Sequence, residues 1–189
     1  MSTKSIMIVG VGGQGTLLAS RILGNLLLGE GYDVKVSEVH GMSQRGGSVV
    51  TYVKYGDRVY SPIIDRGEAD LILAFEMLEA YRALPYLSAT GKMIINTQRI
   101  DPMPVITGAA EYPSDIPGKL SACANVTAAD ALTLAREAGN VKAVNVVLIG
   151  MMARHTDIPR ESWLRALREI VPPKLLDINL RAFDLGYRL

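Results

Sequence analysis

The residues best suited to chemistry form a glycine-rich turn near the start of the chain. Residues 10–15 read Gly-Val-Gly-Gly-Gln-Gly, between an apolar run at 6–9 and a helix-forming segment that begins at Thr16. In this strand–turn–helix context the G-x-G-x-x-G spacing binds phosphate, because the new helix presents unpaired N–H groups and the positive end of its dipole. We therefore predict that a phosphate or carboxylate binds here. The alternative is a tight turn that holds no ligand.

Five residues of this turn are expected to contact a cofactor. Gly10 permits the tight turn, Gly12 lets the backbone approach a ligand, and Gly15 allows close packing of the helix on the strand. Gly13 adds a further position without a side chain to the turn, and Gln14 adds an amide that can donate or accept a hydrogen bond.

A second polar loop is expected at the same edge of the sheet, since open α/β sheets bind ligands outside the carboxyl ends of their strands. Glu38 follows the turn by about 20 residues, where a dinucleotide fold places the carboxylate that binds a ribose hydroxyl. The guanidinium of Arg45 can grip a phosphate or carboxylate with two N–H groups, although an Arg45–Glu38 ion pair that braces the loop is the alternative. The predicted ligand contacts in this loop are Glu38, Ser43, Gln44, Arg45, Gly46 and Gly47.

The sequence does not indicate a metal or redox centre within this chain. It has one cysteine, Cys123, and two histidines, His40 and His155. One thiol cannot supply the four thiolates of an iron–sulfur cluster, and two histidines are few for a metal site. We expect Cys123 to be a buried structural thiol and His155 to cap a helix end. For His40 a hydrogen-bonded structural role is expected, with a general base as the alternative, and no residue is assigned as catalytic.

Bulk properties exclude several classes of partner. The formal net charge of +1 provides no broad field for nucleic acid or a membrane surface. No apolar run approaches the roughly 20 residues that a membrane-spanning helix needs, and a strand begins too early to leave room for a signal peptide. We predict one domain over residues 1–189, located in the cytoplasm.

Alternating strands and helices are expected to position the turn and the loop. The pattern predicts an α/β fold, with a Rossmann-like, mostly parallel sheet, an inserted β-hairpin and a helix-rich C-terminal third. The predicted strands are 33–39, 48–55, 58–61, 69–75 and 92–97 besides the first, with 48–61 as the hairpin. The predicted helices are 16–28, 77–86, 127–138, 143–154, 159–171 and 174–187, and residues 98–118, with four prolines, are expected to be irregular.

The ordered set of motifs resembles a known family. Besides the glycine turn and residues 38–49, the chain carries Ala-Asp-Leu at 69–71, Gly-Asn at 139–140 and Asn-Val-Val-Leu-Ile-Gly at 145–150. Over essentially the whole chain, this set is similar to the gamma-type subunit of 2-oxoacid:ferredoxin oxidoreductases. The loop sequence His-Gly-Met-Ser-Gln-Arg-Gly-Gly resembles that of the indolepyruvate branch, in which the corresponding chain is the beta subunit. In the pyruvate relatives this loop usually reads Gly-Pro-Glu-x-Arg-Gly-Gly.

The resemblance implies oxidative decarboxylation of an aryl 2-oxoacid with coenzyme A, which gives an acyl-CoA, carbon dioxide and reduced ferredoxin. It also implies a large catalytic subunit that holds thiamine diphosphate and iron–sulfur clusters, because this chain has no cluster ligands and no Gly-Asp-Gly…Asn signature. Coenzyme A would be a co-substrate, and ferredoxin would be reached through the complex. The alternatives are a stand-alone NAD(P)-dependent oxidoreductase and a non-catalytic nucleotide-binding module.

A subunit separated from its partner is expected to expose an apolar surface and to self-associate, with a homodimer as the commonest outcome. Aromatic residues are enriched at interfaces and supply the candidates, although half of them could equally lie in the core. These are Tyr52, Tyr55, Tyr60, Trp163, Phe183 and Tyr187.

Overall fold

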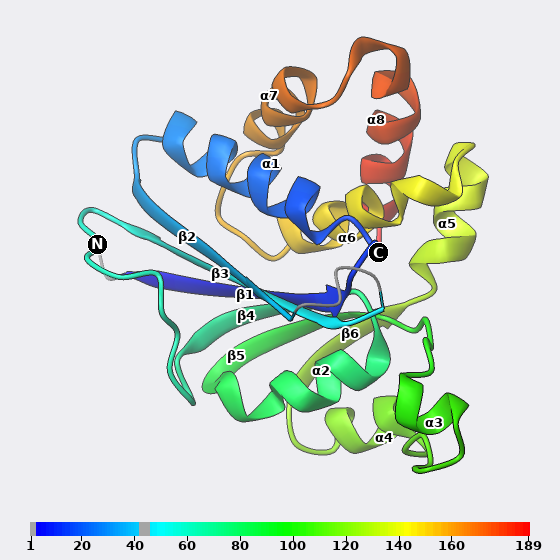
Figure 1. The fold of residues 1–189 in the computed structure, drawn as a ribbon. Coiled ribbons are helices and arrows are strands. Elements are labelled where there is room, and N and C mark those ends of the chain that lie inside the picture. The colour runs from blue at the N-terminus through cyan, green and yellow to red at the C-terminus, as the bar shows by residue number, and fades with distance from the viewer. Residues whose placement is uncertain (1–2, 42–45) are drawn as a thin grey trace.

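A six-stranded sheet forms the middle layer of the protein, in a computed structural model that describes residues 3–41 and 46–189 (Figure 1). The strand order is β2-β3-β1-β4-β5-β6. Its members are β1 (Lys4–Val11), β2 (Asp33–His40), β3 (Ser48–Gly56), β4 (Ala69–Ala74), β5 (Leu87–Asn96) and β6 (Asn125–Ala129). β3 runs antiparallel to β1 and β2, whereas the pairs β1–β4, β4–β5 and β5–β6 are parallel. The carboxyl ends of these parallel strands therefore share one edge of the sheet.

Helices cover both faces of the sheet (Figure 1). One face carries α1 (Thr16–Gly29), α6 (Val144–Ala153), α7 (Arg160–Ile170) and α8 (Pro173–Tyr187), and the other carries α2 (Met77–Ala83) and α4 (Ile116–Ser121). The remaining short elements are η1 (Leu84–Tyr86), α3 (Met103–Ile106), α5 (Ala131–Ala138) and η2 (Val141–Ala143). In the part of the chain that the structure describes, no helix is both long and apolar enough to cross a membrane. A cytoplasmic location stays a prediction.

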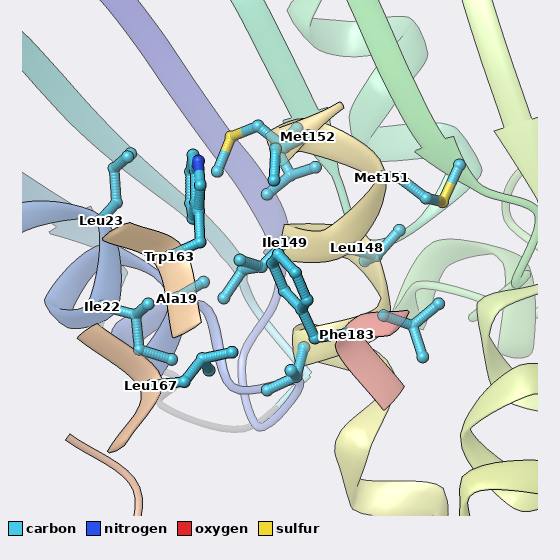
Figure 2. Close-up of a cluster of buried hydrophobic side chains, with 14 of the residues drawn as sticks. Ala19, Ile22, Leu23, Leu148, Ile149, Met151, Met152, Trp163, Leu167 and Phe183 are labelled. Atoms are coloured by element: carbon cyan, nitrogen blue, oxygen red, sulfur yellow. The ribbon is translucent and has the colours of Figure 1, made fainter. Parts of the chain in front are cut away.

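The predicted fold class is confirmed, and burial explains it. β1 and β4 are almost wholly buried, as expected for central strands that helices cover on both sides. α6 is apolar all round and every one of its residues is buried, because it lies between the sheet and the outer helices. Figure 2 shows side chains from α1, α6, α7 and α8 meeting in this layer.

The aromatic residues expected at an interface divide between core and surface. Trp163 and Phe183 are fully buried in the core that Figure 2 shows, so these two candidates follow the alternative of a core position. Both lie on the apolar faces by which α7 and α8 pack onto α1 and α6. Tyr60, in contrast, is 80% exposed.

An antiparallel hairpin is present, but it is formed by other strands than predicted. It consists of β2 and β3, and residues 58–61 do not form a returning strand. β3 lies between β2 and β1, so both of its edges are already paired. Residues 58–61 instead follow the sheet margin, where the Val59 N–H donates to the Asp33 carboxylate at 2.8 Å.

Two further segments differ from the prediction. Residues 127–129 belong to β6 rather than to a helix, because parallel pairing with β5 prevails over their local preference. Asp130 then caps α5, accepting from the Thr133 N–H at 3.0 Å. The proline-rich excursion at 98–118 contains the short helix α3 and the start of α4.

Cys123 and His155 also differ from expectation. Cys123 is exposed, because it follows the end of α4, where Leu120 takes the buried position. His155 does not act as a charged helix cap, since its Nδ1 atom lies 3.0 Å from the Nζ atom of Lys92. Burial lowers the pKa of His155, and the charges of Lys92 and Arg154 lower it further, so the imidazole is neutral near pH 7.

The pKa of His155 makes stability depend on pH. Because its folded-state pKa lies below the unfolded value of about 6.5, the unfolded chain binds the proton first as pH falls. The neutral His155 therefore contributes its full share of stability above about pH 6.5, and this share is lost as the pH falls through the folded-state pKa. We expect the free energy of unfolding, measured in urea, to fall less between pH 7.5 and pH 5 for His155→Gln than for the native chain. An equal loss in both would contradict this origin.

α6 and α8 cross at unusually short range through two glycines. A Cβ atom on Gly186 would lie 2.0 Å from the carbonyl oxygen of Val147, and one on Gly150 would lie 2.2 Å from that of Phe183. Both are backbone contacts, which cannot yield by a rotamer change. The two helices must therefore separate if either glycine gains a side chain.

Gly186→Ala should destabilise the protein by at least about 3 kcal/mol, at the upper end of overpacking costs. Gly24→Ala is the matched control. Gly24 lies inside α1, and among the described residues an added Cβ would meet only a methyl group of Val36, at 4.0 Å. The control should gain about 0.5–1 kcal/mol from helix propensity. Denaturant unfolding of both variants measures the difference, and a mild effect of Gly186→Ala would refute the close crossing.

Candidate functional site

The glycine turn lies at the carboxyl edge of the sheet, between β1 and α1 (Figure 1). Gly15 is the N-cap residue of α1 with a φ of 88°, and Gly13 has a φ of 102°, so both occupy the left-handed region that favours glycine. Among the described residues no side chain caps α1, and no acidic residue occupies its first turn. The N–H groups and positive dipole end of α1 are thus available to an anion.

The amide of Gln14 ties the turn to the rest of the edge. Its Oε1 atom accepts from the Val11 N–H at 2.8 Å, and its Nε2 atom donates to the Phe75 carbonyl at 3.0 Å and to Gln98 Oε1 at 3.3 Å. The buried Asn96 donates to the same carbonyl at 3.1 Å and to the same Gln98 oxygen at 3.2 Å. Because Gln14 is engaged inside the protein, its contact with a ligand stays a prediction.

The two predicted loops meet in the structure. The N–H of Gly12 donates to the Gly47 carbonyl at 2.8 Å, and the N–H of Gly46 donates to the Gly12 carbonyl at 3.3 Å. Gly10 packs inside the turn, where an added Cβ would lie 3.0 Å from the Cβ of Phe75. The sequence therefore identified the right neighbours, but Gly10 and Gly12 serve the protein's own contacts.

Three of the predicted ligand contacts cannot be placed. Ser43, Gln44 and Arg45 lie outside the described residues. Their flanking residues, Gly46 and Gly47, lie beside the glycine turn through the hydrogen bonds to Gly12. The predicted contacts of these residues with a ligand stay predictions.

Two clefts flank the first turn of α1. The first, called here the α1–β2 cleft, has a volume of about 410 Å³. It is lined by Gly12, Gly13, Gly15, Thr16, Leu17, Glu38, His40 and Val49. Glu38 thus lies where the spacing predicted, and its carboxylate accepts from the Thr51 hydroxyl at 3.3 Å. His40 is exposed and its Nδ1 atom lies 3.1 Å from the Gly41 carbonyl.

The second cleft, the α1–α6 cleft, has a volume of about 510 Å³ and contains residues that the sequence did not single out. It is lined by Gly13, Gln14, Gly15, Gln98, Leu132, Val141, Lys142, Val144 and Asn145. Lys142 brings a positive charge to the cleft that flanks the N-terminal end of α1. Asn145 is buried, and an added Cβ on Gly15 would lie 2.6 Å from its Nδ2 atom. A glycine at position 15 is therefore required by this contact as well as by its φ.

A buried carboxylate anchors the excursion that follows β5. Glu76 accepts from the N–H groups of Glu79 and Ile100 at 3.0 and 3.1 Å, and from the Tyr112 hydroxyl at 2.6 Å. Burial raises the pKa of Tyr112, and the hydrogen bond to Glu76 raises it further. The guanidinium of Arg99 covers the Tyr112 ring at 4.3 Å. This arrangement fixes the backbone next to Gln98, which lines the α1–α6 cleft.

The donor set does not suit a metal or cluster. Among residues 3–41 and 46–189, no three His, Cys, Asp or Glu side chains are grouped so that they could hold a metal ion. The single cysteine of the whole sequence cannot ligate an iron–sulfur cluster alone. What the described edge provides is backbone N–H groups, amides, one lysine and the side chains of Glu38 and His40.

Comparison with known proteins identifies the family. The model of the pyruvate ferredoxin/flavodoxin oxidoreductase family matches residues 5–189. The chain belongs to this family. "Indolepyruvate oxidoreductase subunit IorB" of Thermococcus kodakarensis is 44% identical to it over all of this chain and 96% of the relative. The protein of the same name from Methanothermobacter thermautotrophicus is 40% identical over 97% of this chain and 95% of the relative.

Solved structures share the fold of this family member. A keto/oxoacid ferredoxin oxidoreductase gamma subunit from Geobacter sulfurreducens superposes with a TM-score of 0.73 at 22% identity, covering 98% of this chain and 96% of that one. The pyruvate oxidoreductase subunit PORC of Thermotoga maritima gives 0.74 at 20% identity, covering 100% and 97%. The resemblance to gamma-type subunits is confirmed. The chain is a small subunit of a 2-oxoacid:ferredoxin oxidoreductase, an enzyme that works as an assembly.

The amide of Gln14 allows a test of how the oxidoreductase subunit holds its turn. Gln14→Glu keeps the acceptor for the Val11 N–H but places a carboxylate oxygen against the Phe75 carbonyl, where the native amide donates. We expect destabilisation by about 1–3 kcal/mol, the cost of an unmade buried hydrogen bond. Denaturant unfolding at pH 7.5 measures it. Arg21→Gln, an exposed change on α1, is the control, and equal stability of both variants would show that the amide bridge is unimportant.

Proposed function

We propose that the enzyme containing this subunit oxidatively decarboxylates an aryl 2-oxoacid of the indolepyruvate type, giving acyl-CoA, carbon dioxide and reduced ferredoxin. The named indolepyruvate relatives support this substrate, since they are 40–44% identical over nearly the whole chain. Relatives named for ketoisovalerate or pyruvate are only 24–28% identical. The larger identity favours the indolepyruvate branch.

We propose that a larger partner subunit holds thiamine diphosphate and the iron–sulfur clusters. Thiamine diphosphate would supply carbanion stabilisation, and the clusters would carry the electrons to ferredoxin. The donor set described above supports this division, because the described residues contain no grouping for a metal and the sequence has one thiol. A homodimer of the isolated chain stays a prediction, which light scattering at micromolar concentration would test.

The contribution proposed for this chain is to bind an anionic group of coenzyme A at the glycine turn. The uncapped first turn of α1, free of acidic side chains and open to clefts on both sides, is the observation that carries this proposal. Lys142 in the α1–α6 cleft adds to the positive potential. A protein that shares the fold, the 2-oxoglutarate:ferredoxin oxidoreductase of Magnetococcus marinus, was solved with coenzyme A bound, at 16% identity and a TM-score of 0.71. It covers all of this chain, which matches 31% of that one.

Substrate choice is tested on the complex produced with its large subunit. Viologen reduction with coenzyme A should give a kcat/KM for indolepyruvate at least about tenfold above those for pyruvate and 2-ketoisovalerate, a difference of about 1.4 kcal/mol in transition-state stabilisation. The small subunit assayed alone should show no activity. A preference for an aliphatic oxoacid would overturn the substrate, and activity of the lone chain would overturn the division of labour.

Leu17 provides a test of the anion site that does not alter the glycines. It is 57% exposed in the first turn of α1 and lines the α1–β2 cleft. Leu17→Asp places a like charge beside an incoming phosphate, so we expect the KM for coenzyme A to rise roughly five- to tenfold at low salt, with kcat little changed.

Two controls separate charge from position in this test. Leu17→Asn introduces a polar side chain of the same size as aspartate but without its charge, and it should change the KM for coenzyme A far less. Leu28→Asp places the charge at the other end of α1, where the native leucine is 63% exposed, and should leave the KM unchanged. Equal KM values for all variants would show that coenzyme A does not approach this helix.

A further inference from the structure

A polar pocket lies at the opposite edge of the sheet from the glycine turn. Here the amino ends of β1, β4 and β5 lie beneath the loop that joins α6 to α7 (Figure 1). The pocket, called here the amino-edge pocket, has a volume of about 290 Å³. Its titratable lining residues are Lys4, Tyr55, Asp70, Lys92, His155 and Asp157.

One end of the amino-edge pocket is basic. Lys92 extends from β5 and His155 from the loop after α6, and their nitrogen atoms Nζ and Nδ1 lie 3.0 Å apart. Two groups that can both carry positive charge are costly to hold this close, so the imidazole accepts from the ammonium as a neutral ring. A ligand anion at this end would offset that repulsion and allow both groups to donate. The basic end therefore fits a carboxylate or a phosphate.

The other end, called here the acidic end, holds the carboxylates of Asp70 and Asp157, and Lys4, which pairs with Tyr55 in the β1–β3 register, also lines the pocket. Asp70 accepts from the Ser5 N–H at 2.8 Å, which leaves one of its two oxygens for another donor. Asp157 is exposed at the rim. Burial and Tyr32, together with the charges of Asp70 and Asp157, raise the pKa of Tyr55 to about 12. The two carboxylates, both of which act on Tyr55, favour an ammonium group.

The charges of the pocket balance without pairing. Lys4 and Lys92 offset Asp70 and Asp157 formally, with His155 neutral. Yet in the described part of the chain no ion pair within 4.0 Å joins either lysine to either aspartate. A ligand of one sign would gain at one end and be repelled at the other. A ligand that carries both signs gains at both.

We propose that the amino-edge pocket binds a small zwitterion of the α-amino acid class. Its carboxylate would bind Lys92 and His155, its ammonium would face Asp70 and Asp157, and an aliphatic side chain would rest on Ile6 and Leu71, which also line the pocket. The proposal does not depend on coenzyme A or on the oxoacid, because it uses the edge of the sheet remote from the glycine turn.

Histidine NMR on the full-length chain tests this directly, since the chain has only His40 and His155. L-leucine is the probe, 4-methylpentanoate is the same skeleton without the ammonium, and inorganic phosphate tests for a simple anion site. L-leucine should shift the His155 ring resonance saturably and leave His40 unmoved. The other two should bind at least about tenfold more weakly, since each leaves the acidic end unpaired.

Each other outcome overturns the proposal. No saturable shift with L-leucine would mean that the pocket is only a surface hollow, and equal binding of 4-methylpentanoate or phosphate would make it an anion site instead. Lys92→Met should abolish the shift while Lys119→Met, on α4, should preserve it. If Lys92→Met fails to fold, Asp157→Asn on the exposed rim should weaken L-leucine about tenfold and leave 4-methylpentanoate unchanged, and retention of full L-leucine affinity would refute the ammonium contact.

Discussion

The side-chain amide of Gln14 joins the carboxyl ends of β1 and β4, and the candidate site depends on that bridge. A parallel sheet ends in several separate strand termini whose backbone groups need partners. Here Gln14 supplies them for Val11 and Phe75, and Gln98 and Asn96 extend the bridge to β5. The Oδ1 atom of Asn96 then accepts from the Ala131 N–H at 3.1 Å, which fixes the start of α5. One chain of amides thereby sets the position of α1 and of both clefts.

The helical layer above the sheet makes this edge rigid. α6 is buried on every side, and its crossing with α8 is set by backbone contact at Gly150 and Gly186. Such a crossing leaves little freedom for the helices to slide, because a glycine contact has no side chain that can adapt. Asn145 at the start of α6 reaches the backbone of Gly15, so the same helix that fills the core also limits the glycine turn.

Local patterns predicted most of the fold, and long-range partners account for the remainder. The helix at α1 and the buried strands follow from apolar periodicity and from glycine and proline positions, which are properties of neighbouring residues. The strand β6 was missed because its pairing with β5 depends on residues more than 30 positions away. The predicted strand at 58–61 failed for a similar reason, since nothing local reveals that both edges of β3 are occupied.

The candidate site shows the same limit. Glycine spacing correctly predicted the turn, and Glu38 was placed beside it from the expected distance along the chain. Lys142 and Asn145 reach that turn across more than 120 residues, and Asn145 had entered only as part of a family motif. The contact of Gln14 with a ligand stays a prediction, but its hydrogen bond to the Phe75 carbonyl could not be predicted, because an outward-facing amide in a glycine turn and an inward-facing one have the same sequence. Only the position of Phe75 distinguishes them.

The two edges of the sheet differ in a way that fits a subunit of a larger enzyme. At the carboxyl edge the described residues offer N–H groups and Lys142, which suit an anion but cannot transfer electrons or stabilise a carbanion. Glu38 and His40, which also lie there, are exposed, and the described hydrogen bonds of their side chains join them to Thr51 and Gly41. At the amino edge the described residues include two lysines and two aspartates that line one pocket without an ion pair between them. A chain built this way contributes binding energy and position, and that contribution becomes catalytic only where a partner supplies the reacting groups.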